Sequence, residues 1–212
     1  RPEPAGPNVG MAYPAPLEAL VEAFQVLPGI GRRTAERLAL HVLRDPSARA
    51  LGLAIETAVK DTKRCTICRN VCEQEPCVIC SDSKRDARRV LVVEEPAHVE
   101  SVERAGVWEG RYHVLLGSFN PAEGTDARHL AVGGLIERLR SNVVQVDEVV
   151  LGMDPDKEGE ATLLLVLEAI ESAGLGVSVS RLSRGLPAGS GIEYLHRGVL
   201  EDAIEDRRAV RR

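Results

Sequence analysis

The sequence feature that most restricts the possible folds is a group of cysteines about a third of the way along the chain. Two Cys-x-x-Cys pairs stand eight residues apart, and their members are Cys65, Cys68, Cys77 and Cys80. Four thiolates on two tight turns can close a tetrahedral shell around zinc and leave no position for water, which makes such a site structural. The segment is too short for a hydrophobic core of its own. We therefore predict that a structural zinc ion holds it together.

Disulfide bonds and a redox-active pair are the alternatives for these cysteines. The first residues lack the apolar segment of an export signal, and disulfides are rare in the cytoplasm, where we expect this protein to reside. A redox pair would not need a second copy of itself. The fifth cysteine, Cys72, lies between the two pairs, and we expect it to pack as a small side chain rather than bind metal.

Charge is distributed unevenly along the chain, although the formal net charge is only −5. Residues 26–89 contain 13 basic and 8 acidic side chains, whereas residues 90–206 contain 9 basic and 21 acidic ones. Lys and Arg displace counterions from nucleic acid and so supply much of the affinity for phosphate. The first region can therefore face DNA, whereas the second would repel it.

Two kinds of periodicity divide the chain. Apolar residues within 16–43 recur at intervals of three and four, which predicts two helices that meet at the Leu-Pro-Gly-Ile-Gly stretch 27–31, and a third helix is expected over 48–60. From residue 89 onward, apolar runs alternate with helical segments. Strands are expected at 90–93, 112–116, 146–151 and 177–182, and helices at 97–105, 127–140, 160–173 and 192–205. This alternation predicts an α/β fold with a mainly parallel sheet flanked by helices.

The corner between the first two helices is a candidate phosphate-binding site. Its glycines allow a tight turn whose backbone N–H groups, with the N-terminus of the following helix, can point at one anion. This turn resembles a helix-hairpin-helix motif, which grips a DNA phosphate without reading bases. The candidate DNA-binding residues are Gly29, Ile30, Gly31, Arg32, Arg33 and Arg37. The alternative is a plain helical hairpin whose arginines are only solvated.

Carboxylates follow two of the predicted strands. Glu94 ends the first strand, and Asp154, Asp156, Glu158 and Glu160 come after the third. The carboxyl ends of parallel strands are where ligands bind in open α/β sheets. A Glu after one strand and an Asp-x-Asp after another resemble the Toprim domain of topoisomerases and primases, whose carboxylates hold Mg²⁺, an ion that prefers oxygen ligands. The alternative is a set of solvated loop carboxylates.

Taken in order, the LPGIG corner, the four cysteines, VVEEP, the GEAT run and RGLPAG resemble the RecR family of bacterial recombination mediators over nearly all of residues 11–210. The resemblance implies a Toprim domain flanked by DNA-binding elements and a ring-like homo-oligomer, a tetramer or dimer of dimers, that clamps DNA. It also implies partnership with RecO and RecF in loading recombinase at gapped DNA, without catalytic turnover. By position, Arg33 and Arg37 match DNA contacts, the paired cysteines match zinc ligands, and Glu94, Glu158 and Glu160 match Toprim acids at the RecO contact.

One departure from that family keeps an enzyme as the alternative function. The family usually reads like NPxxEGEAT here, whereas this chain retains both Asp154 and Asp156, as topoisomerases do. A Mg²⁺-dependent Toprim nuclease or nicking enzyme could use these aspartates with Glu94. Against it, Tyr112 lies in an expected strand, and Tyr13 and Tyr194 have no basic pocket legible in the sequence to make either a nucleophile.

The motifs divide the chain into five segments. Residues 1–10 are rich in Pro and Gly and are expected to be disordered; the hairpin region, the zinc finger, the Toprim domain and a helical C-terminal segment then occupy 11–62, 63–84, 85–182 and 183–212. No apolar run reaches the roughly 18 to 20 residues of a membrane span. We therefore expect a cytoplasmic, nucleoid-associated protein.

Overall fold

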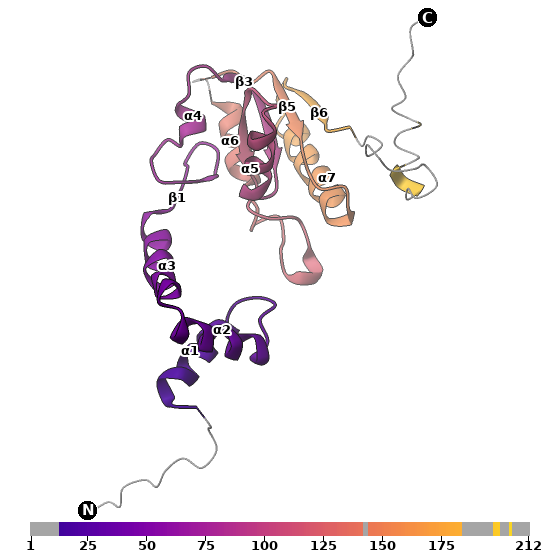
Figure 1. Ribbon diagram of the computed structural model, residues 1–212. Coiled ribbons are helices and arrows are strands. Elements are labelled where there is room, and N and C mark those ends of the chain that lie inside the picture. Colours follow the sequence, from indigo (N-terminus) through magenta and orange to yellow (C-terminus); the bar gives the residue numbers. More distant parts are fainter. Residues whose placement is uncertain (1–12, 142–143, 184–196, 200–203, 205–212) are drawn as a thin grey trace, which may run out of the picture. The chain divides into compact units, whose positions relative to one another are not determined.

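A computed structural model describes residues 13–141, 144–183, 197–199 and 204, and it divides the chain into two compact units, Arg1–Thr62 and Lys63–Arg212 (Figure 1). Residues 1–10, which we expect to be disordered, and the RGLPAG stretch both lie outside the described residues. So does the expected helix over 192–205, apart from 197–199 and 204.

The first unit is entirely helical in its described part. It comprises α1 (Ala15–Gln25), α2 (Arg32–Arg44), the 3-10 helix η1 (Pro46–Arg49) and α3 (Ala50–Asp61). Helices α1 and α2 pack together through the buried side chains of Val21, Ala35 and Ala39. The two small alanines on α2 allow the helices to approach closely. The predicted hairpin is therefore present, with its corner at the predicted residues.

The second unit contains the predicted parallel sheet. Its strands are β3 (Asp86–Val93), β4 (Gly110–Val114), β5 (Glu148–Leu151) and β6 (Ser178–Arg181), all parallel and in the order β4-β3-β5-β6. The connecting helices are α5 (Pro96–Ala105), α6 (Val132–Arg140) and α7 (Lys157–Ser172), and a 3-10 helix η2 (Pro121–Glu123) lies before α6. The prediction of an α/β fold is confirmed.

Helices cover both faces of this sheet. On one face, Leu91 and Val93 of β3 pack with Val99 of α5. On the other face, Val90 and Val92 pack in a larger cluster to which α6 and α7 contribute. Because β3 is buried on both faces, its second half is a continuous apolar run rather than an alternating one.

Several element boundaries differ from the expected ones, and three of these differences have local reasons. The strand expected over 112–116 ends at Val114, and Leu116 soon after has φ 70°, which ends an extended chain. The helix expected from 127 begins at Val132, because the Asp126 side chain accepts the backbone N–H of Arg128 and forms a turn instead. Helix α7 starts three residues early, at Lys157, because Asp156 caps it.

The cysteine segment lies against the edge of the sheet. It is built from β1 (Lys63–Arg64), β2 (Val71–Cys72) and the short helix α4 (Val78–Ser81). The Val114 backbone N–H on the outer strand β4 donates to the Cys68 carbonyl oxygen over 2.8 Å. The segment therefore covers part of an edge whose unpaired backbone groups would otherwise be exposed.

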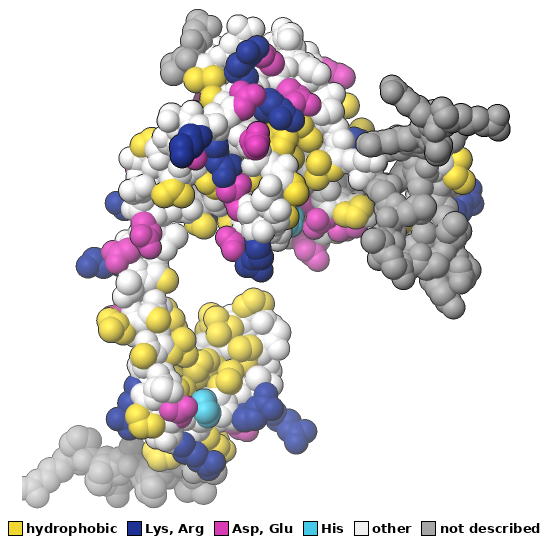
Figure 2. All heavy atoms as spheres, turned by 45° about the horizontal axis from the view of Figure 1, so that its top comes forward, with side chains coloured by type: hydrophobic (Ala, Val, Ile, Leu, Met, Phe, Trp, Pro, Cys, Tyr) yellow, Lys and Arg dark blue, Asp and Glu magenta, His cyan; other side chains and the backbone are white. Residues whose placement is uncertain are grey.

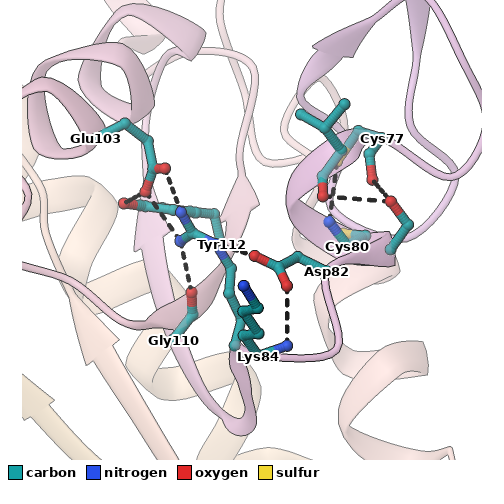
Figure 3. Close-up of polar contacts among 10 residues, drawn as sticks. Cys77, Cys80, Asp82, Lys84, Glu103, Gly110 and Tyr112 are labelled. Carbon is teal, nitrogen blue, oxygen red and sulfur yellow. Dashed lines mark hydrogen bonds and ion pairs between the residues drawn. The ribbon is translucent and has the colours of Figure 1, made fainter.

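A polar network ties the end of the cysteine segment to α5 and β4 (Figure 3). Arg85 donates to Glu103 over 2.9 Å and to the Gly110 carbonyl oxygen over 3.1 Å, and the Tyr112 hydroxyl donates to the same Glu103 over 2.5 Å. Bidentate arginine pairs of this kind fix orientation as well as distance. The network therefore holds the exit of the cysteine segment in a fixed register with the sheet.

No helix among the described residues is both long and apolar enough to cross a membrane.

Candidate functional site

The four paired cysteines converge on one point. Their sulfur atoms lie within 4.8 Å of one another and all four side chains are buried. Cys68 Sγ and Cys77 Sγ are 3.6 Å apart. A tetrahedron with Zn–S bonds of about 2.3 Å has edges of about 3.8 Å, whereas the sulfurs of a disulfide are about 2.0 Å apart. The arrangement therefore fits a metal ion and does not fit disulfides.

Backbone N–H groups donate hydrogen bonds to two of the cysteine sulfurs, which favours their thiolate form. The Cys77 side chain caps α4 and accepts the Cys80 N–H over 3.4 Å, while Cys65 Sγ accepts the Cys77 N–H over 3.5 Å. Burial raises the pKa of the Cys77 thiol, so its thiolate requires a nearby positive charge. Cys72 is half-buried beside the group, whose four members do not include it.

Arg138 supplies part of that positive charge, and the sequence patterns did not predict it. Its guanidinium donates to the Tyr112 carbonyl oxygen over 2.6 Å and interacts electrostatically with Cys80 and Cys68. Burial lowers the pKa of this guanidinium. Four thiolates around one Zn²⁺ retain a net charge of about −2. The half-buried Arg138 beside them partly compensates that charge.

The hairpin corner has the geometry of an anion site. Gly29 adopts φ 76°, a left-handed conformation that favours glycine, and Gly31 is the N-cap of α2 without any side-chain hydrogen bond. The first backbone N–H groups of a helix have no partners within it. No side chain among the described residues takes their place, so these donors and the positive end of the helix dipole are available to an anion.

The three arginines after the corner do not have the same role. Arg32 donates to Glu18 on α1 through both terminal nitrogens and to Glu36 through Nε, so it joins the two helices. This pairing lowers the pKa of Glu18. Arg33 and Arg37 are exposed, and within the part of the chain that the structure describes neither forms an ion pair. Figure 2 shows Lys and Arg side chains standing out from the surface of this helical unit.

Two of the predicted acids meet at the carboxyl ends of β3 and β5. The Asp154 backbone N–H donates to Glu94 Oε2 over 2.9 Å, and Asp154 Oδ2 lies 3.6 Å from Nε2 of His98 on α5. Burial raises the pKa of the Glu94 carboxyl, and the Asp154 carboxylate adds to that effect. One ligand atom from each of these three residues lies within 4.8 Å of the other two. His98 was not predicted, although it follows the strand-end Glu94 by four residues.

The remaining acids are used differently. Asp156 caps α7, where its side chain accepts the Gly159 N–H over 2.7 Å. Glu160 forms an ion pair with Arg181 of β6 over 3.4 Å. Glu158 is half-buried, and its carbonyl oxygen accepts the Thr162 hydroxyl over 2.7 Å. The described residues therefore place Glu94 and Asp154 beside His98, and they do not bring Asp156 into that group.

Comparison with known proteins identifies the same three segments. The family described as RecR, helix-hairpin-helix, matches residues 17–59; the four-cysteine zinc finger domain of RecR matches 62–82; and the Toprim domain matches 88–183. These matches and the buried cysteine group support a structural zinc site.

Full-length relatives are similar to the chain over most of its length. Recombination protein RecR of Enterococcus faecalis is 40% identical over 202 residues, which cover 94% of this chain and 100% of the relative. The protein of that name from Bifidobacterium longum is 41% identical over 202 residues (94% and 99%), and the one from Chlorobium limicola is 41% identical over 204 residues (92% and 98%). The chain belongs to the RecR family of recombination proteins.

Proposed function

We propose that this protein is a non-catalytic recombination mediator that binds DNA through the phosphates and not through the bases. The observation that carries the proposal is the uncapped N-terminus of α2 at the corner, flanked by the exposed arginines Arg33 and Arg37. Backbone N–H groups and arginines without an ion-pair partner can bind a phosphate, and phosphate contacts carry no information about the base sequence. Gly29, Ile30 and Gly31 would then supply the backbone of the contact.

Arg32 has a supporting role in this proposal. Its guanidinium is occupied by Glu18 and Glu36, so its first contribution is to hold α1 against α2 and fix the shape of the corner. A rigid corner loses less entropy when it binds an anion than a mobile loop does. We therefore assign the direct phosphate contacts to Arg33, Arg37 and the backbone N–H groups of the corner.

We further propose that Cys65, Cys68, Cys77 and Cys80 together hold one zinc ion. Its role is to fold the segment between the helical unit and the sheet, because metal-binding energy in such small sites is folding energy. The Arg85 network and the Cys68 carbonyl contact would transmit that order to β4.

Membership of the family supports a proposal for the partners and the assembly. We propose that the protein acts with RecO and RecF at gapped DNA, loads recombinase there, and forms a ring-like homo-oligomer at the nucleoid. The acidic character of residues 90–206, with 21 acidic and 9 basic side chains, suits a basic protein surface better than a second DNA contact. Glu158 and Glu160 are the acids that we assign to RecO.

A Mg²⁺-dependent nicking enzyme is the second candidate, favoured by the convergence of Glu94 and Asp154. A topoisomerase-like nicking enzyme would also need a tyrosine that reaches DNA, whereas a nuclease would use metal-bound water. Tyr112 is completely buried with its hydroxyl on Glu103, Tyr13 is half-buried in the helical unit, and Tyr194 lies outside the described residues. Incubation of supercoiled plasmid with the protein and Mg²⁺ separates the two functions. Nicking that disappears in Asp154→Asn would mean that the protein is an enzyme and not a non-catalytic mediator.

The DNA contact is tested by Arg33→Ala combined with Arg37→Ala, measured on unrelated DNA sequences across a salt series. The logarithm of the DNA-binding constant falls linearly with the logarithm of the salt concentration, and each lost phosphate contact should reduce the size of that slope by about 0.9. We therefore expect a reduction of about 1.8 for the two changes together, with weaker binding to every DNA sequence. The matched control is Arg104→Ala combined with Arg128→Ala, which removes the same charge from exposed positions of the second unit. Equal effects of the two pairs would mean that only overall charge matters.

A further inference from the structure

The group formed by Glu94, His98 and Asp154 lies apart from the cysteine site and has the composition of a metal site. Glu94 directly follows β3, His98 lies in the first turn of α5, and Asp154 follows β5. Neighbouring parallel strands bring the two carboxylates to the same edge of the sheet. The ligand atoms of all three residues lie within 4.8 Å of one another, a spacing from which a small shift of side chains closes around one ion.

Glu94 provides an independent sign that something is bound there. Glu94 is only 3% exposed, and one of its carboxylate oxygens, Oε2, accepts the backbone N–H of Asp154. The other oxygen, Oε1, is buried and has no hydrogen-bond partner among the described residues. His98 Nδ1 is also buried without such a partner. Buried polar atoms in folded proteins are nearly always paired, so two unpaired ones on neighbouring side chains are a sign of a ligand-binding site.

The chemistry of that ligand differs from the Mg²⁺ that an Asp-x-Asp pair would hold. Asp156 is the N-cap of α7, and its Oδ1 accepts the Gly159 N–H over 2.7 Å. The third position is occupied instead by an imidazole. Mg²⁺ prefers oxygen ligands and gives up water reluctantly, whereas imidazole nitrogen suits transition metals. Two carboxylates and one imidazole together offer the mixed oxygen and nitrogen ligands that a divalent transition metal accepts.

We infer that Glu94, His98 and Asp154 form a second metal site, selective for a divalent transition metal over Mg²⁺, in which His98 takes the place of Asp156. The site leaves coordination positions for water, because three protein ligands do not complete the shell of such an ion. Its position at the carboxyl edge of the sheet leaves Asp154 more than half exposed, so the metal remains accessible to a phosphate or a carboxylate from outside.

Mn²⁺ is the probe that tests this site. It stands lowest among the common divalent transition metals in affinity for nitrogen and sulfur ligands, so it does not displace zinc from thiolates. The zinc-loaded protein is titrated with Mn²⁺, and free Mn²⁺ is measured from its electron paramagnetic resonance signal. We expect one Mn²⁺ per chain beyond the zinc, with millimolar Mg²⁺ failing to displace it. Absence of a bound Mn²⁺, or displacement by Mg²⁺ at equal concentration, would overturn the inference.

Variants identify the ligands. His98→Gln and Glu94→Gln should each weaken Mn²⁺ binding by at least about tenfold, the lower range for disturbing a metal site. Asp156→Asn is the matched control: asparagine still caps a helix, so Mn²⁺ binding should not change. The opposite pattern, in which Asp156→Asn weakens binding and His98→Gln does not, would assign the site to the Asp-x-Asp pair. Urea unfolding followed by Trp108 fluorescence establishes that each variant is folded, and DNA binding is measured separately because the proposed function does not require this metal.

Discussion

A buried histidine in the sheet should make the second unit lose stability in mild acid. His113 lies on β4 and is completely buried, with Nε2 at 2.9 Å from the Ala131 carbonyl oxygen and Nδ1 without a partner among the described residues. Burial lowers the pKa of His113 to about 4, and the nearby cations Arg138 and Arg69 contribute to the same effect. The imidazole is therefore neutral in the folded protein at pH values where the unfolded chain binds a proton.

The magnitude follows from the two pKa values. An unfolded histidine has a pKa of about 6.5, so the contribution of a neutral His113 is complete above that value and is lost as the pH falls toward about 4. Between about pH 7.5 and about pH 5.5, the free energy of unfolding should fall by about 1.4 kcal/mol from this residue alone. The full effect, reached below the folded pKa, would be about 3 kcal/mol.

The assay is urea unfolding at both pH values, followed by the fluorescence of Trp108, the single tryptophan, which is half-buried and packs against the core of the sheet unit. The variant His113→Gln cannot take up a proton but can still donate to the Ala131 carbonyl oxygen. Its loss of stability should be smaller than that of the natural chain by about 1.4 kcal/mol. Proton uptake by the cysteine site is common to both proteins and cancels in this difference.

A matched change at His129, whose side chain is 58% exposed, controls for the loss of a histidine as such. His129→Gln should leave the pH dependence of the natural chain largely in place, because most of that side chain is in water in both states. If His113→Gln and the natural chain lose the same free energy between the two pH values, the inference that His113 is held neutral by burial is wrong.

The remaining predictions concern packing and zinc. A Cβ at Gly159 would overlap the Asp154 carbonyl oxygen, so Gly159→Ala should lower the free energy of unfolding by roughly 1 to 3 kcal/mol in the same fluorescence assay. In Gly133→Ala the new Cβ meets no atom within 4 Å, and this change in an α-helix should raise stability by roughly 0.5 to 1 kcal/mol. Cys72→Ser should retain one zinc per chain by metal analysis, whereas Cys65→Ser should lose zinc and unfold the segment; zinc loss in both would make Cys72 a ligand.

Local patterns in the sequence were sufficient for the cysteine group, the hairpin corner and the parallel sheet. Two Cys-x-x-Cys pairs impose turns by their own spacing, and Gly29 adopts the left-handed conformation that its lack of a side chain permits. The apolar run of β3 marks a strand buried on both faces. Each of these features depends on residues close together in the chain, so the order of residue types is enough to predict them.

Only the tertiary structure decided which charged side chains are available for function. Arg32 follows the corner just as Arg33 does, yet it faces Glu18 across the hairpin because α1 and α2 pack closely. Asp156 was expected beside Asp154, but capping α7 uses its side chain, and His98 lies beside the strand ends in its place. Partners in long-range contacts depend on the register of strands and the rotation of helices about their axes. Neighbours in the sequence do not set these quantities; the burial of the whole core does.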